Sequence, residues 1–116
     1  MGRARTKALD ISPAVKRAVW ERDGHHCIIC GRHDAAPNAH FIARSQGGLG
    51  IEQNIVTLCL DCHSKYDNSE ARKGYRIAIR HYLMSKYPDW DERDLYYKKG
   101  ELYDKDFLNR QPDKRP

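Results

Sequence analysis

The stretch NAHFIARSQGGLGIEQNIVTLCLDCHSKYD, residues 38–67, contains a histidine, a run of glycines, an asparagine and a Cys-His pair. Its candidates for chemistry are His40, Asn54, His63 and Asp67, and two cysteines lie among them. Either these side chains form one active site, or metal-bound cysteines only stabilise the fold and the histidines have no role in chemistry. The cysteines and the flanking sequence help to choose between the two interpretations.

The chain contains two CxxC pairs, Cys27 with Cys30 and Cys59 with Cys62. Each pair can fold as a knuckle that presents two thiolates to one ion, and two knuckles make a closed, tetrahedral zinc site of the structural kind. Free thiols or a thioredoxin-like redox pair are the alternatives, but two CxxC units in one chain favour a single structural zinc. In so small a chain, that zinc would supply much of the folding free energy.

The composition sets broad limits. A chain of 116 residues suits one domain with a modest core. The formal net charge of +5 points weakly toward a polyanionic partner such as nucleic acid. No apolar run is long enough to span a bilayer, and the N-terminal residues lack the apolar stretch of a signal peptide, so we expect a cytoplasmic protein. In that compartment four cysteines are more often metal ligands than disulfides.

Local signals predict the elements before and within the motif. Ser12 followed by Pro13 indicates a helix start, and apolar residues at helical spacing continue it as far as Gly24. Short strands are expected around residues 39–43 and 55–58. The segment RSQGGLG between them, residues 44–50, should be a flexible loop without regular structure.

Helices should follow the second strand. One is expected to begin near Leu60 or Asp61, and a longer one to run over residues 69–87 and stop at Pro88. Residues 90–99 are expected to form one more short helix.

The chain therefore divides into four predicted segments. They are a basic flexible arm (1–11), a zinc-knuckle core (12–67), C-terminal helices packed on that core (68–99) and a polar tail (100–116).

The order of these motifs resembles the zinc-knuckle branch of the HNH endonucleases, which are ββα-metal nucleases. The matching residues are Ala39-His40, Asn54 at the head of Asn-Ile-Val-Thr-Leu, and Cys62-His63, with a CxxC pair on either side. The likeness covers about residues 12–67. It implies an α+β fold: a ββα-metal core with a four-cysteine zinc knuckle and flanking helices.

The resemblance also implies a divalent-metal-dependent endonuclease that hydrolyses DNA phosphodiester bonds, by nicking or by double-strand cleavage. His40 would be the general base, since histidine titrates near neutral pH. His63 would bind the catalytic ion, Mg²⁺ or Mn²⁺, or alternatively Ni²⁺ or Zn²⁺, which polarises the phosphate. Asn54 would hold the loop between the strands and orient His40 through its backbone.

One ligand of the catalytic ion is missing. Most HNH sequences carry an acid or a histidine directly before the general base, but Ala39 has no ligand atom. Asp67 lies one helical turn after His63, so both side chains can share an ion. Asn38 is a weaker candidate, and the alternative is that Asp67 only caps its helix. If Asp67 is the ligand, Ala39→Asp should partly rescue Asp67→Ala.

Four arginines are candidates for phosphate contacts. Arg44 begins the glycine loop, while Arg72, Arg76 and Arg80 form a stripe along the long helix that can equally be a solvated face. No segment shows a base-reading motif, so we expect weak sequence specificity.

Partners and rival functions follow from the same resemblance. Small HNH proteins of this kind resemble those encoded in phages near packaging genes, which suggests a terminase partner. The rival interpretations are a non-catalytic zinc-knuckle module that binds nucleic acid, and an RNA-directed nuclease.

Overall fold

The computed structural model describes residues 2–98 of the chain. In chain order the elements are α1 (Gly2–Leu9), α2 (Pro13–Arg22), β1 (Ala35–His40), the 3-10 turns η1 (Arg44–Gln46) and η2 (Glu52–Asn54), β2 (Ile55–Cys59), α3 (Leu60–Asn68), α4 (Arg72–Lys86) and the 3-10 turn η3 (Glu92–Leu95). The architecture is mixed α+β, as the sequence predicts. The expected polar tail, residues 100–116, lies outside the described residues.

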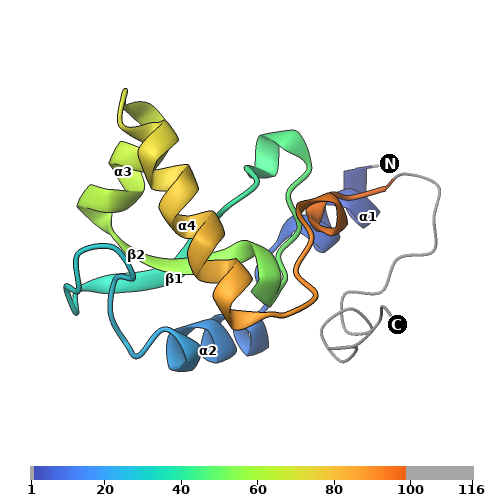
Figure 1. The fold of residues 1–116 in the computed structure, drawn as a ribbon. Helices are drawn as coiled ribbons and strands as arrows, with labels where there is room; N and C mark the ends of the chain where they lie inside the picture. Colours follow the sequence, from blue (N-terminus) through green and yellow to red (C-terminus); the bar gives the residue numbers. More distant parts are fainter. Residues whose placement is uncertain (1, 99–116) are drawn as a thin grey trace.

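A two-stranded antiparallel sheet and the helix that directly follows it form the centre of the fold. β1 pairs with β2 from Ala35 opposite Cys59 to His40 opposite Ile55, with a register irregularity between Ala36 and Ala39. Figure 1 shows α2 below the two strands, α3 above them, and α4 crossing in front of them. This ββα arrangement places the end of β1, the start of α3 and the loop between the strands close to one another.

The strand predictions are confirmed with one shift. β2 covers the expected residues 55–58 and adds Cys59. β1, in contrast, begins and ends earlier than the predicted 39–43. The chain leaves the sheet after His40, where the Phe41 N–H donates to the Asn54 carbonyl (2.7 Å) and Phe41 is buried in the core.

The helix α2 is confirmed at its predicted start. The Ser12 side chain accepts a hydrogen bond from the Val15 N–H (3.2 Å), and Pro13 is the first helical residue. Val15 and Val19 are buried, so this helix contributes one apolar face to the core. It ends at Arg22, as the glycine after Asp23 predicts.

The prediction of a flexible N-terminal arm over residues 1–11 is wrong, because Gly2–Leu9 form α1. Ala8 and Leu9 are buried in the hydrophobic core. The Ala8 carbonyl accepts a hydrogen bond from the Gly50 N–H (3.1 Å), which fastens the end of the helix to the glycine loop. The reason for the error is tertiary: two apolar residues in a basic segment find a partner surface distant in sequence.

The glycine loop is also more ordered than predicted. Within residues 44–50, Arg44–Gln46 form a 3-10 turn and Leu49 is fully buried. The Leu49 N–H donates to the Leu95 carbonyl (2.9 Å), and residue 50 must be a glycine for a steric reason. A Cβ atom there would lie 2.0 Å from the Asp10 carbonyl oxygen.

The C-terminal helices follow the prediction with shorter bounds. α3 begins at Leu60, as expected. α4 begins at Arg72 rather than at residue 69, because the Ser69 hydroxyl donates to the Lys65 carbonyl and accepts from the Ala71 N–H in a turn between the helices. In place of a helix over 90–99, η3 forms a single 3-10 turn.

A buried polar network ties α2 to β2 and α4. The Arg22 guanidinium donates to the carbonyls of Glu52 (2.8 Å) and Ile55 (2.7 Å). The neighbouring Asp23 carboxylate accepts from the Thr57 N–H (2.8 Å) and from the Tyr82 hydroxyl (2.6 Å). These bonds fix η2 and the start of β2, the segment from which Asn54 projects.

Within residues 2–98, every helix is too short or too polar to cross a lipid bilayer.

Candidate active site and metal centre

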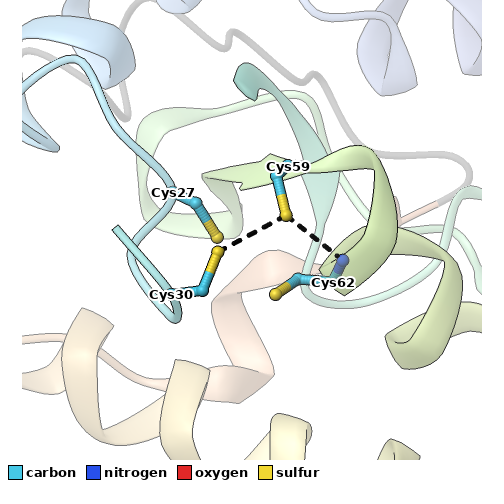
Figure 2. Close-up of side chains that lie close together, drawn as sticks. All are labelled: Cys27, Cys30, Cys59 and Cys62. Carbon is cyan, nitrogen blue, oxygen red and sulfur yellow. Dashed lines mark hydrogen bonds between the residues drawn. The ribbon is translucent and has the colours of Figure 1, made fainter. Parts of the chain in front are cut away.

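The four cysteines come together at one end of the sheet, as Figure 2 shows. Their sulfur atoms all lie within 4.8 Å of one another. Cys27 and Cys30 belong to the turn after α2, Cys59 ends β2, and Cys62 lies in the first turn of α3. Cys30 is exposed, whereas the other three are buried. The predicted cysteine cluster is therefore confirmed.

The cluster fits a tetrahedral zinc ion. Zinc–sulfur bonds of about 2.3 Å place the sulfur atoms about 3.8 Å apart, and the Sγ atoms of Cys30 and Cys59 are 3.6 Å apart. The Cys62 N–H donates to the Cys59 Sγ (3.4 Å), a knuckle contact that Figure 2 marks. In the first knuckle Gly31 takes a positive φ of 83°, which lets the backbone turn tightly after Cys30.

The surroundings of Cys27 and Cys62 shift the pKa values of these two thiols in opposite directions. Burial acts to raise the pKa of Cys27, but the backbone N–H groups of Cys30, Cys59 and Ile29 lower it to about 7. Burial, with the adjacent thiols of Cys59 and Cys27, raises the pKa of Cys62. Four sulfurs this close cannot all ionise unless a cation offsets their charge, and zinc would supply that charge.

A separate pocket of about 420 Å³ opens between the end of β1, the glycine loop and α3. Its lining comprises Asn38, His40, Ala43, Arg44, Ser45, Gln46, His63, Tyr66, Asp67 and Arg72. The fold therefore brings His40, His63 and Asp67 of the predicted site together with two of the four arginines. Because successive side chains of a strand point to opposite faces, Asn38 and His40 both line the pocket, while Ala39 is fully buried in the core.

His63 and Asp67 lie side by side on α3. The His63 Nε2 and the Asp67 Oδ2 are 3.3 Å apart, and both side chains remain partly exposed. One imidazole nitrogen and one carboxylate at this distance are a donor set that suits a divalent cation. Asn38 lines the same pocket and adds an amide oxygen within the same cavity. His63 and Asp67 are therefore the adjacent pair of side chains that would hold a catalytic ion here, since Ala39 has no ligand atom.

His40 is half-buried at the end of β1. Its Nε2 lies 2.9 Å from the Leu9 carbonyl oxygen. Burial lowers the pKa of His40, and the nearby charges of Arg44 and His63 act in the same direction against the Leu9 carbonyl. The imidazole is therefore neutral at neutral pH, which is the form that can accept a proton.

Asn54 is fully buried at the end of η2. Its Oδ1 accepts from the Ile42 N–H (2.8 Å), and its Nδ2 donates to the carbonyls of Ile42 (3.2 Å) and Leu49 (2.8 Å). The side chain thus clamps both ends of the glycine loop, directly after His40. Asn54 does not line the pocket, so any effect on chemistry passes through the backbone.

Comparison with known proteins agrees with this geometry. The family model for the HNH endonuclease matches residues 27–69, which include both knuckles and all three motif elements. Anaredoxin from Nostoc sp. (strain PCC 7120) is 33% identical over 58 residues, which cover 49% of this chain and 76% of that protein. The chain belongs to the HNH endonuclease family. No solved structure matches it. HNH proteins are typically nucleases, and here the two motif histidines line one pocket.

The four arginines fall into two groups around this HNH motif. Arg44 and Arg72 line the pocket. Arg44 pairs with Asp10 (2.6 Å), and the Arg72 guanidinium lies 4.9 Å from the centre of the Tyr66 ring.

Arg76 and Arg80 share one partner away from the pocket. Both form ion pairs with the Glu92 carboxylate on η3, and Arg76 also lies over the Phe41 ring. The predicted stripe along α4 is therefore divided, because Glu92 offsets the charge of its second half.

Some residues that line or contact the pocket were not predicted from the sequence. Tyr66 follows His63 at the i+3 position, a signal that was present in the sequence, and its hydroxyl donates to the Phe41 carbonyl (2.6 Å). Ser45 and Gln46 belong to a loop with no such periodic signal. The Leu9 carbonyl, at the end of α1, and the following Asp10 contact the pocket residues His40 and Arg44, and nothing in the local sequence places that segment beside the HNH motif.

Proposed function

We propose that this HNH protein is a divalent-metal-dependent endonuclease that hydrolyses DNA phosphodiester bonds. The observation that carries the proposal is the pocket itself. In it a neutral, half-buried His40 shares one cavity with the His63–Asp67 pair, and two arginines line the same cavity. A base, a set of cation ligands and phosphate-binding cations are the parts that phosphodiester hydrolysis needs.

Each residue has a separate role in this reaction. His40 takes the proton of the attacking water, and Arg44 and Arg72 hold phosphate oxygens on either side of the scissile bond. His63 and Asp67 hold the divalent ion, with Asn38 as a further oxygen donor. When bound, the ion would polarise the phosphate and stabilise the leaving 3′ oxygen, so that the product would carry a 5′ phosphate. Asn54 keeps the glycine loop, and with it the chain next to His40, in place.

Binding rests on phosphate contacts in this proposal. The family acts on DNA, and the sequence shows no base-reading motif, so specificity should be weak. A phage terminase is the proposed partner in the cell, by analogy with small HNH proteins encoded beside packaging genes. Co-purification of a tagged copy with the large terminase subunit, if one is encoded nearby, would test that part separately.

A plasmid assay tests the nuclease proposal. Supercoiled plasmid is incubated with the zinc-loaded protein with and without Mg²⁺ or Mn²⁺, and nicked and linear products are separated on a gel. His40→Ala should keep the fold, the zinc and the DNA affinity, and lower the cleavage rate on the order of 10²- to 10⁴-fold. His81→Ala is the matched control, because His81 is exposed on α4 and does not line the pocket. Cleavage by His40→Ala at the parent rate would refute the role of His40.

One observation favours a second candidate, a zinc-knuckle module that binds nucleic acid without cutting it. Ala39 occupies the position where most HNH sequences carry a metal ligand, and it is buried. This candidate predicts tight zinc and DNA binding with no cleavage under any divalent ion. Repeating the assay with structured RNA separates the remaining rival, an RNA-directed nuclease.

A further inference from the structure

We propose that the C-terminal end of α1 is a positioning element of the active site. In this proposal the Leu9 carbonyl fixes the orientation and tautomer of His40, so that Nδ1 is the nitrogen that accepts the proton. The inference rests on the proposed nuclease function. It concerns a segment outside residues 27–69, the range that the HNH family model matches.

The first step is the identity of the donor. The His40 Nε2 lies 2.9 Å from the Leu9 carbonyl oxygen, and a carbonyl oxygen can only accept a hydrogen bond. Nε2 must therefore carry the hydrogen. A neutral imidazole has a single N–H, so its Nδ1 has the free lone pair. The contact thus selects one of the two nitrogens as the base.

The second step is the rigidity of the acceptor. Ala8 and Leu9 are buried in the core, and the Ala8 carbonyl is bonded to the Gly50 N–H (3.1 Å). The Asp10 N–H continues the helical bonding to the Thr6 carbonyl (3.0 Å). Side-chain burial and backbone bonds on both sides therefore hold the Leu9 carbonyl in place, which is what a positioning group requires.

The third step links the same segment to a pocket cation. The Asp10 carboxylate pairs with Arg44 (2.6 Å), one of the two arginines that line the pocket. The last residue of α1 and the residue after it thus contact two different pocket residues. Removal of this helix end should therefore disturb the base and a phosphate-binding cation together, and leave the zinc centre intact.

Gly50→Ala is the sharpest single test. A Cβ atom at residue 50 would lie 2.0 Å from the Asp10 carbonyl oxygen and 2.9 Å from that of Leu9, so the helix end must move away. The substitution alters neither His40 nor any other pocket side chain. Gly74→Ala is the matched control, because a Cβ at residue 74 meets no atom within 4 Å.

The measurement has two readouts on the zinc-loaded, full-length chain. Long-range proton–nitrogen correlation spectra of histidine-labelled protein report which ring nitrogen of His40 carries the hydrogen, with His40→Gln to assign the signal. The parent and Gly74→Ala should show the Nε2–H form alone. Gly50→Ala should show a mixture of tautomers, and its maximal cleavage rate should fall on the order of 10²-fold. Its DNA affinity should fall as well, because the displaced Asp10 pairs with Arg44.

The outcomes separate this inference from the nuclease proposal. An Nδ1–H form in the parent protein would overturn the inference, whether or not the protein cuts DNA. So would a Gly50→Ala variant whose His40 signals and cleavage rate equal those of Gly74→Ala. If Gly50→Ala does not fold, Leu9→Ala replaces it, because it weakens the anchoring of the same carbonyl without a clash. A parent protein that shows the Nε2–H form but never cuts would refute the nuclease proposal and leave the contact established.

Discussion

The Asn54 clamp can be tested by the substitution Asn54→Ala, which removes one acceptor and one amide donor group from a fully buried position. Three hydrogen bonds are lost: two of 2.8 Å, with the Ile42 N–H and the Leu49 carbonyl, and a longer one of 3.2 Å to the Ile42 carbonyl. Alanine cannot replace any of them. The glycine loop would keep its sequence but lose the side chain that joins its two ends.

The magnitude follows from the groups that remain. A buried backbone N–H or carbonyl that loses its partner costs about 1–3 kcal/mol. The two short bonds, to Ile42 and Leu49, therefore predict a loss of about 2–6 kcal/mol in the free energy of unfolding. A domain of this size has a total stability of only about 5–15 kcal/mol. Asn54→Ala should thus be among the most destabilising single substitutions outside the cysteines.

The assay is urea denaturation at saturating zinc, with tryptophan fluorescence as the signal that monitors unfolding. Gln53→Ala is the control from the adjacent residue, since the Gln53 Oε1 is buried without a hydrogen-bond partner in the described structure. Its removal should cost less than about 1 kcal/mol, because no side-chain acceptor bond is broken. A free energy of unfolding for Asn54→Ala within about 0.5 kcal/mol of that of Gln53→Ala would refute the clamp.

Four further predictions concern the metals, the pH dependence and DNA binding. Native mass spectrometry should show one zinc per chain that survives mild EDTA treatment, while cleavage is lost and returns with added Mg²⁺ or Mn²⁺; Cys30→Ser should unfold the domain rather than slow it. Asp67→Ala should raise the Mg²⁺ concentration that gives half-maximal cleavage, with zinc content unchanged. An unchanged Mg²⁺ dependence would show that Asp67 is not a ligand and only caps its helix. Burial lowers the pKa of His40 below its ordinary 6.5, so the base stays neutral and kcat/KM should hold as the pH falls to 6.5 and decline only below it. A decline of kcat/KM that begins above pH 6.5 would contradict the role of His40 as the base. The same shift contributes folding stability that is present above pH 6.5 and is lost as the pH falls through the lowered pKa of His40. DNA affinity should fall steeply with salt, and Arg72→Ala should weaken it more than Arg80→Ala, whose guanidinium is already paired with Glu92.

Elements with local signals could be predicted from the sequence. The Ser12 cap with Pro13 marks the start of α2, the β-branched run after Asn54 marks β2, and the CxxC spacing marks the metal cluster. The position of α1 could not be predicted in this way. Its burial depends on contacts between Ala8, Leu9 and a loop some forty residues later in the chain, and no periodicity within GRARTKAL reports those contacts.

The cysteine cluster and the proposed site of the catalytic ion are connected through α3. Cys59 caps this helix and Cys62 lies in its first turn, while His63 and Asp67 follow on the same helix. The cysteine cluster therefore sets the position of the helix that carries His63 and Asp67, the proposed ligands of a catalytic ion. Zinc would be structural in this arrangement. Because α3 carries residues of both sites, the loss of zinc should also abolish the binding of the proposed catalytic ion.

The burial of Ala39 is the reason why we place the proposed ligands on α3. Ala39 pairs with Val56 next to the register irregularity of β1 and is fully buried in the core, on the face of the strand away from the pocket. An acid at this position would bury a carboxylate, which costs several kcal/mol unless it finds a partner. The expectation that Ala39→Asp rescues Asp67→Ala therefore loses its basis, and that substitution should destabilise the fold instead. The side chains that we propose as ligands of the ion are therefore His63 and Asp67 on α3 and Asn38 on β1, all of which line the pocket.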